Sequence, residues 1–312
     1  MAAFHISMIL APVVLAILGL AYLGVVVRTA WRLTHPNRGF VPEGYAAAGL
    51  PLERVRLLSR DGHAIAGWIA RRPAAPGAVV LSHGVWTNHR EMESRAAALW
   101  ERGFNVLLFD YRACGESAGN VTTLGLREGG DLLGAIDFLA GEPERAPIGV
   151  WGNSMGGAVA LLAAAKCPHI DAVISDSAFA VLTDNIGHGF RAVTGLPAWP
   201  FRHAILAVVQ FIARADLAAV RPVDQIAALA PRPLLLVHGE DDRLVRVEDA
   251  HALHRAAGEP KELWRLPDCG HVEAFELFPE EFADRAERFL REAFAATGRP
   301  PCDLAAAEPA AC

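Results

Sequence analysis

Apolar runs of four to six residues alternate with longer, partly polar segments between residues 78 and 296. Such runs are typical of buried strands, whereas apolar residues repeated every three or four positions are typical of amphipathic helices. Strands that alternate with helices predict a parallel sheet with helices on both faces, the α/β class. The pattern predicts strands at 78–81, 104–109, 147–151, 172–174, 233–237 and 261–266. It predicts helices at 91–101, 126–139, 158–165 and 247–257, and a last helix whose apolar stripe covers 282–293.

The segment before this region has a different period. Residues 52–58 and 63–70 alternate apolar and polar side chains on either side of Asp61-Gly62. An Asp-Gly pair between two alternating runs is a strong signal for a β-hairpin. We therefore expect two antiparallel strands to precede the parallel part of the sheet.

The amino-terminal region is apolar throughout. Residues 7–27 contain no charged side chain and are long enough for a helix to cross the hydrocarbon core of a bilayer. A cleaved signal peptide is the alternative, but the only basic groups before the run are His5 and the amino terminus, and Val25-Val26-Val27-Arg28 is a poor cleavage site. The sequence therefore predicts an uncleaved transmembrane anchor over residues 1–30, followed by a Gly- and Pro-rich linker over 31–51.

Charge indicates how this anchor is oriented. Arg28, Arg32 and Arg38 follow the apolar run, and no Lys or Arg precedes it. The positive-inside tendency then predicts a single-pass protein whose carboxyl-terminal domain is cytoplasmic. An odd number of cysteines, five, without a C-x-x-C pair, suggests neither a disulfide framework nor a zinc site. The net charge of −6 argues against a nucleic-acid-binding surface.

Residues 178–220 interrupt the alternation of strands and helices. Glycine and proline break the segment repeatedly before an apolar helix predicted at 201–212. One interpretation is an extra packed helix, and the other is a small helical lid that faces an acyl chain or the membrane surface. At the other end of the chain, residues 297–312 are rich in Ala and Pro and are predicted to be disordered.

The stretch with the clearest chemistry is Gly152-Asn153-Ser154-Met155-Gly156, which lies between a predicted strand and a predicted helix. A G-x-S-x-G sequence in this context is the signature of a nucleophile elbow, a sharp turn that exposes the serine hydroxyl above the sheet. We expect the glycines to permit both the backbone angles and the close packing of this turn. The alternative is a glycine-rich turn with an incidental serine.

A serine hydroxyl needs a general base, a group that orients the base and donors for the oxyanion. His271 and Asp242 each follow a predicted strand, and their order after Ser154 is the order on this type of fold. Asp241 is the alternative acid because it is the neighbour of Asp242. Asp176 also ends a strand, but we expect its carboxylate to bond to local backbone.

Taken together, these motifs make the chain resemble the α/β-hydrolase superfamily. It is most similar to the compact branch with serine aminopeptidase-like enzymes and membrane-anchored α/β-hydrolase-domain acyl hydrolases and depalmitoylases. The resemblance covers about residues 52 to 291 and rests on His83-Gly84, Asp110-Tyr111-Arg112 with Gly115 and Ser117, Gly152 to Gly156, His238-Gly239 with Asp242 and Val245, and Gly270-His271.

The resemblance implies a fold and a set of roles. The fold is an α/β-hydrolase domain over 52–296, with an eight-stranded, mostly parallel sheet and the 178–220 lid insertion. Ser154 matches the nucleophile, His271 the base and Asp242 the acid, and the backbone amides of Val85 and Met155 match the oxyanion hole. No metal or cofactor is implied. Asp110-Tyr111-Arg112 is expected to connect loops beneath the site.

The sequence therefore predicts a membrane-tethered serine hydrolase that cleaves an ester or thioester of an acyl or other lipophilic substrate. One alternative is an aminopeptidase-like amidase with an acidic pocket for a free amino group, built on Glu91 or Glu93. Another is a non-catalytic binding protein on a hydrolase fold. Acyl transfer in place of hydrolysis also stays open.

Overall fold

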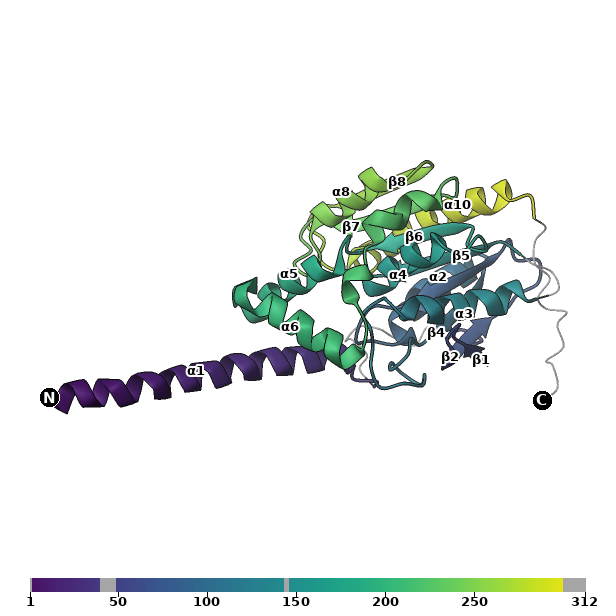
Figure 1. Ribbon diagram of the computed structural model, residues 1–312. Helices are drawn as coiled ribbons and strands as arrows, with labels where there is room; N and C mark the ends of the chain where they lie inside the picture. The colour runs from purple at the N-terminus through teal and green to yellow at the C-terminus, as the bar shows by residue number, and fades with distance from the viewer. Residues whose placement is uncertain (1, 40–48, 143–145, 300–312) are drawn as a thin grey trace.

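In the computed structural model, which describes residues 2–39, 49–142 and 146–299, eight strands form one sheet (Figure 1). The strands are β1 (Glu53–Leu58), β2 (Ala64–Ala70), β3 (Ala78–Ser82), β4 (Asn105–Phe109), β5 (Ile148–Asn153), β6 (Ala172–Asp176), β7 (Leu234–Gly239) and β8 (Lys261–Leu266). They are hydrogen-bonded in the order β1-β2-β4-β3-β5-β6-β7-β8. The predicted eight-stranded sheet is confirmed.

Strand direction follows the two sequence patterns. The strands β1 and β2 form the predicted antiparallel hairpin, in which Gly62 turns with a φ of +86°. The strand β2 also pairs antiparallel with β4, while every other pair in the sheet is parallel. The carboxyl ends of the parallel strands therefore lie along one edge, where ligand sites form in such sheets.

Helices cover both faces of the sheet (Figure 1). Alternate residues of a strand point to opposite faces, so Val80 and Val150 belong to one buried cluster and Leu81 and Trp151 to another. The first cluster includes residues of α3 (Glu128–Ala140), α4 (Met155–Ala164) and α8 (Val247–Ala256). The second includes residues of α2 (Glu93–Glu101), α9 (Ala274–Leu277) and α10 (Pro279–Ala296). Short helical turns complete the domain: η1 (His89–Met92), η2 (Leu217–Ala219), α7 (Pro222–Gln225) and η3 (Ile226–Leu229).

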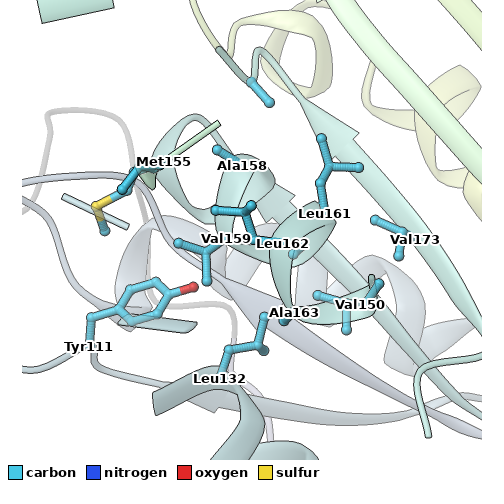
Figure 2. Close-up of a cluster of buried hydrophobic side chains, with 14 of the residues drawn as sticks. Tyr111, Leu132, Val150, Met155, Ala158, Val159, Leu161, Leu162, Ala163 and Val173 are labelled. Carbon is cyan, nitrogen blue, oxygen red and sulfur yellow. The ribbon is translucent and has the colours of Figure 1, made fainter. Parts of the chain in front are cut away.

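The helix α4, which follows the G-x-S-x-G stretch, is buried along its whole length. Its many alanines let the helix axis approach the sheet, and its larger side chains fill the space that remains. Figure 2 shows Val159 and Leu162 of this helix in the same buried cluster as Val150 and Val173 of the sheet. The helix carrying the candidate nucleophile is therefore fixed by the main core.

The amino-terminal helix α1 (Ala2–Thr34) is the one helix of the described residues that is long and apolar enough to cross a membrane by itself, over Leu10–Thr34. It continues past the predicted end at residue 30, because its last turns pack on the domain. Val26 and Ala30 are buried there. The free part of α1 projects away from the sheet (Figure 1). The predicted linker falls partly, and the predicted disordered tail mostly, outside the described residues.

The predicted insertion consists chiefly of two helices, α5 (Leu182–Thr194) and α6 (Ala198–Ala213). The sequence pattern predicted most of α6 but not α5. The chain bends by 119° between the two helices. Gly195 makes the turn with a φ of +71°, a conformation that glycine adopts without strain. The helix α6 then packs beside the end of α1.

Candidate active site

Ser154 lies in a strained turn between β5 and α4. Its φ of 52° and ψ of −116° are unusual for a residue with a side chain, and its amide donates to the Asp176 carbonyl at 2.7 Å. A Cβ at Gly152 would lie 2.3 Å from the Gly156 carbonyl oxygen, and one at Gly156 would lie 2.2 Å from the Ser82 carbonyl oxygen. The glycines therefore provide the close packing of the elbow, while the unusual backbone angles fall on Ser154.

The structure brings the three predicted triad residues together. His271, in the loop between β8 and α9, has its Nε2 2.9 Å from Ser154 Oγ. Its Nδ1 lies 2.6 Å from Oδ2 of Asp242, in the loop between β7 and α8. In the tautomer that this network requires, Nδ1–H donates to Asp242 and Nε2 accepts from the serine hydroxyl. The geometry is that of a nucleophile, a base and an orienting acid.

Asp242, and not its neighbour Asp241, is the carboxylate in contact with His271. The Asp242 Oδ1 accepts from the amides of Leu244 and Val245 at 2.8 and 2.9 Å. These bonds leave Oδ2 to face the imidazole. Asp241 is exposed to solvent. The resemblance favoured Asp242 over Asp241, and the two residues differ accordingly in burial and hydrogen bonding.

Val85 and Met155 lie next to Ser154 in the wall of one cavity. Met155 begins α4, so its amide points out of the first turn of that helix, where hydrogen-bond donors and the helix dipole favour negative charge. Within the described part of the chain, no protein oxygen accepts from the backbone amide of either residue. Both donors are thus available to a ligand.

Glu91 connects the two segments that carry these amides. Its carboxylate accepts from the Gly84 amide at 2.8 Å and from the Asn153 side-chain amide at 3.2 Å. Gly84 precedes Val85 in the chain, and Asn153 precedes Ser154. One buried carboxylate therefore braces both sides of the site. Local sequence does not single out Glu91 for this role, because one of its two partners, Asn153, is 62 residues away in the chain.

Arg95 extends this brace to the histidine loop. Its guanidinium is fully buried and donates to the carbonyls of Glu91 at 3.4 Å and Val272 at 3.2 Å. It also pairs with Glu276 at 2.9 Å. Since Val272 follows His271, Arg95 ties the loop of the base to the segment that holds Glu91.

His83 is a structural residue of the same loop. Its Nε2 accepts from the Tyr111 amide at 3.0 Å, and its Nδ1 lies 2.7 Å from the Gly84 carbonyl oxygen. Burial lowers the pKa of His83, so the ring stays neutral with its proton on Nδ1. The ring therefore fixes the backbone just before Val85.

The Asp110-Tyr111-Arg112 motif connects loops beneath the site, as expected. Asp110 accepts from the amide of His89 at 2.8 Å and from that of Glu116 at 2.7 Å. Arg112 forms ion pairs with Asp131 at 2.6 Å and with Asp61 in the β1–β2 hairpin at 2.7 Å. These groups lie away from the cavity and hold its supports in place.

Asp176 differs from expectation. Its carboxylate accepts from the Ser177 hydroxyl at 3.0 Å instead of bonding to local backbone, and its Oδ2 has no partner in the described part of the chain. Burial raises the pKa of Asp176 to about 6. It makes no hydrogen bond to His271, so it lies outside the hydrogen-bonded chain of Ser154, His271 and Asp242.

A cavity of about 500 Å³ lies above Ser154 and His271. Its walls are mostly apolar and come from α5, from the end of α1 and the residues that follow it, and from the loops after β3 to β8. They include Leu33, Trp86, Leu124, Phe179, Leu182, Ile186, Phe190 and Val193. Among the described residues that line the cavity, Arg32 carries a permanent charge and none is an Asp or Glu.

The described cysteines of the domain are buried, packed residues, and the described His, Cys, Asp and Glu side chains do not gather into a group that could hold a metal ion. Cys114 and Cys269 are buried, and burial raises the pKa of the Cys269 thiol to about 12. Cys269 is therefore a neutral, packed thiol. Over residues 2–39, 49–142 and 146–299, no three His, Cys, Asp or Glu side chains lie close enough to hold a metal ion.

The model of the alpha/beta hydrolase family matches residues 79–285, which contain the sheet from β3 onward, the elbow and the triad geometry. The chain belongs to this family. The protein Rv2307c of Mycobacterium tuberculosis is 31% identical over 262 residues, 82% of this chain and 85% of that protein. Human protein ABHD12B is 29% identical over 189 residues, 57% of this chain and 49% of that protein.

Solved structures agree with this assignment. The Pyrococcus furiosus esterase Pf2001 aligns with a TM-score of 0.70 at 26% sequence identity, over 84% of this chain and 99% of the esterase. The predicted α/β-hydrolase fold is thus confirmed, and the protein has the fold of a hydrolase with esterases among its structural neighbours.

Proposed function

We propose that this protein is a serine hydrolase that cleaves carboxylic esters or thioesters of apolar acyl groups. The observation that carries the proposal is the hydrogen-bonded chain from Ser154 through His271 to Asp242, at 2.9 and 2.6 Å, beneath an apolar cavity. It is the arrangement that activates a serine hydroxyl near neutral pH.

The chemistry follows from these positions. Ser154 Oγ attacks the carbonyl carbon of the substrate while its proton passes to His271 Nε2. The amides of Val85 and Met155 donate to the oxyanion that forms, and the imidazolium is stabilised by Asp242. When the tetrahedral intermediate collapses, His271 returns the proton to the departing alcohol or thiol and an acyl-enzyme is left. A water molecule then gives a proton to His271 and attacks the carbonyl carbon of the acyl-enzyme. As the acid is released, His271 returns the proton to Ser154 Oγ.

The cavity favours an acyl substrate over a free amine. Its walls carry apolar side chains, which suit a hydrocarbon chain. An aminopeptidase-like amidase would need a carboxylate facing the substrate ammonium. Glu91 is engaged by Gly84 and Asn153, and neither Glu91 nor Glu93 lines the cavity. Arg32, the permanently charged residue among the described wall residues, would repel an ammonium group.

The helix α1 is proposed to anchor the enzyme in a membrane. Leu10–Thr34 has the length and apolarity of a span, and many side chains of its free part are exposed. Since Arg28, Arg32 and Arg38 lie at the end nearest the domain, we propose that the catalytic domain is cytoplasmic.

The proposal is tested by comparing acyl esters, acyl thioesters and aminoacyl amides as substrates of the detergent-solubilised protein. We expect hydrolysis of the esters or thioesters, loss of that activity in Ser154→Ala, and little cleavage of the amides. Preferred cleavage of aminoacyl amides would replace the esterase proposal with the amidase. Transfer of the acyl group to an added alcohol faster than to water would indicate an acyltransferase.

A further inference from the structure

The corner where α5 meets α6 is an exposed apolar tip. Residues 192–201 carry no charged side chain, while Arg191 and Arg202 flank them. Val193 and Trp199 are 72% and 77% exposed, and Leu196 is exposed as well. Large apolar side chains gathered at one protruding corner are typical of a surface that meets a partner or a lipid bilayer.

The corner lies against the apolar part of α1. The Tyr22 hydroxyl donates to the Pro200 carbonyl at 3.2 Å, and the rings of Tyr22 and Phe201 are 4.9 Å apart. Tyr22 precedes Arg28, the first charged residue of α1 after the apolar run, by six positions. At about 1.5 Å per residue, the contact lies ~9 Å along the helix from Arg28, on the membrane side.

We propose that the α5–α6 corner is a second membrane contact, inserted into the same leaflet from which α1 emerges. The proposal rests on the anchoring role proposed for α1. With Arg28 at the headgroup level, the corner enters the upper acyl region by about the 5–10 Å that interfacial elements reach. In Figure 1 the corner points along α1 toward its free end.

The flanking residues fit this depth. Arg191 and Arg202 follow the apolar tip on its two sides, as Arg28 follows the apolar run of α1. Because the long aliphatic stem of arginine can extend toward the interface, their guanidinium groups would reach the lipid headgroups, where anionic phospholipids attract basic side chains. Trp199 and Tyr22 are residue types that favour the membrane–water interface. A bilayer is favoured over a protein partner because the apolar surface of the tip is continuous with that of α1.

Membrane insertion of the corner would determine how substrate enters. Val193 belongs to the exposed corner and also lines the cavity that contains Ser154. Arg32 and Leu33 of α1 line the same cavity. The cavity thus lies between two elements that contact the bilayer, so an acyl substrate reaches Ser154 from the leaflet without crossing water.

The test uses the full chain in vesicles of phosphatidylcholine and phosphatidylglycerol, with brominated acyl chains as a fluorescence quencher. The signal of Trp199 is the difference between wild type and Trp199→Phe. Phe211 provides the matched control, because it lies on the same helix, is 83% exposed and is 12 residues nearer the catalytic domain. To probe position 211, the fluorescence of the double variant Trp199→Phe/Phe211→Trp is compared with that of the single variant Trp199→Phe. Flotation of the vesicles reports separately whether the protein is anchored.

We expect the protein to float with the vesicles, Trp199 to be quenched strongly by brominated lipid, and the tryptophan at position 211 to be quenched less. Protein that does not float would overturn both the anchor and the second contact. Floating protein whose Trp199 is quenched only by aqueous acrylamide would overturn the second contact alone. Shielding of Trp199 from both quenchers would assign the corner to a second protein surface. Equal quenching at 199 and 211 would mean that α6 lies flat on the membrane, contrary to the proposal.

Discussion

The floor and the wall of the cavity are built in opposite ways. On the floor, Ser154, Asp242 and Glu91 are held by hydrogen bonds to neighbouring backbone and side chains. The wall formed by α1 and α5 is mostly apolar, and its helices continue into surfaces that are exposed. Polar groups with fixed partners suit chemistry that needs a single geometry, whereas apolar walls suit a substrate held by burial.

In the proposed function, this difference separates two tasks. The sheet and its loops would determine the reaction, because the strand ends bring distant residues to one edge. Elements outside the sheet, α1 and the insertion, would shape the space for the substrate. Changes in the floor should therefore alter turnover, and changes in the wall should alter which substrate is used.

Among the tests of this comparison between floor and wall, the largest effect is expected at Asp242, the acid of the proposed triad. Replacing Asp242 with Asn removes the charge that stabilises the imidazolium and favours the wrong tautomer, so we expect kcat to fall by roughly 10³–10⁴-fold. Asp241→Asn, one residue away but exposed, is the matched control and should retain wild-type turnover. Ester hydrolysis under saturating substrate measures both. Equal losses in the two variants would contradict the assignment.

A smaller loss of turnover is expected at Glu91. Glu91→Gln keeps the shape of the side chain but places an N–H donor opposite either Gly84 or Asn153. The oxyanion donors then shift, and we expect kcat to fall by ~10²-fold with little change in KM, on the scale of losing one donor. Glu93→Gln is the control. A change confined to KM would indicate that Glu91 binds substrate, as in the amidase interpretation.

Asp176 allows the floor to be tested through stability. The unfolded carboxyl has a pKa near 3.8 and the folded one about 6, so the folded state keeps its proton more tightly between these values. The contribution of Asp176 to the free energy of unfolding is therefore most favourable at low pH. This contribution falls by no more than ~3 kcal/mol as the pH rises through the folded-state pKa. We expect Asp176→Asn to raise Tm at pH 7.5 more than at pH 4.5.

Thermal unfolding in detergent at the two pH values measures this difference. Asp241→Asn, the same substitution at an exposed position, is the control variant for this comparison. A gain in Tm for Asp176→Asn that is the same at both pH values would mean that the carboxyl is not titrating between them.

The smallest effect is expected in the wall. Gly189 on α5 lines the cavity, and a Cβ there would meet only the Leu244 carbonyl oxygen, at 4.0 Å. Gly189→Leu should fold normally and occupy cavity space, so we expect hydrolysis of long acyl esters to fall by ~10-fold or more relative to short ones. Competition between esters of different chain length measures the ratio. An equal loss for all chain lengths would place this position in the catalytic machinery.

The sequence was sufficient for the elements that depend on local patterns. Strand periodicity, the Asp61-Gly62 turn and the G-x-S-x-G elbow each reappear at the predicted positions. The contact between Ser154, Asp242 and His271 was predictable because parallel strands end at one edge. The helix α5 and the brace at Glu91 were not predicted, since the first lies in an irregular segment and the second depends on contacts between distant loops.

The end of α1 shows the same limit. The apolar composition placed the end of an anchor at residue 30, but the helix continues to Thr34 and its last turns, in which Val26, Ala30 and Thr34 are buried, pack on the domain, mainly on α6. The composition of a segment indicates which structure that segment favours in isolation. It does not report the tertiary contact that extends the helix and makes its last turns part of the cavity.

The most direct test of the central claim is labelling by a fluorophosphonate, which reacts with an activated serine without requiring the natural substrate. Wild type, Ser154→Ala and His271→Ala would be compared by intact mass in detergent, after each has been shown to be folded. We expect one label on wild type and none on either variant. A folded wild-type protein that stays unlabelled, or a Ser154→Ala variant that labels as readily as wild type, would contradict the assignment of Ser154 as the nucleophile.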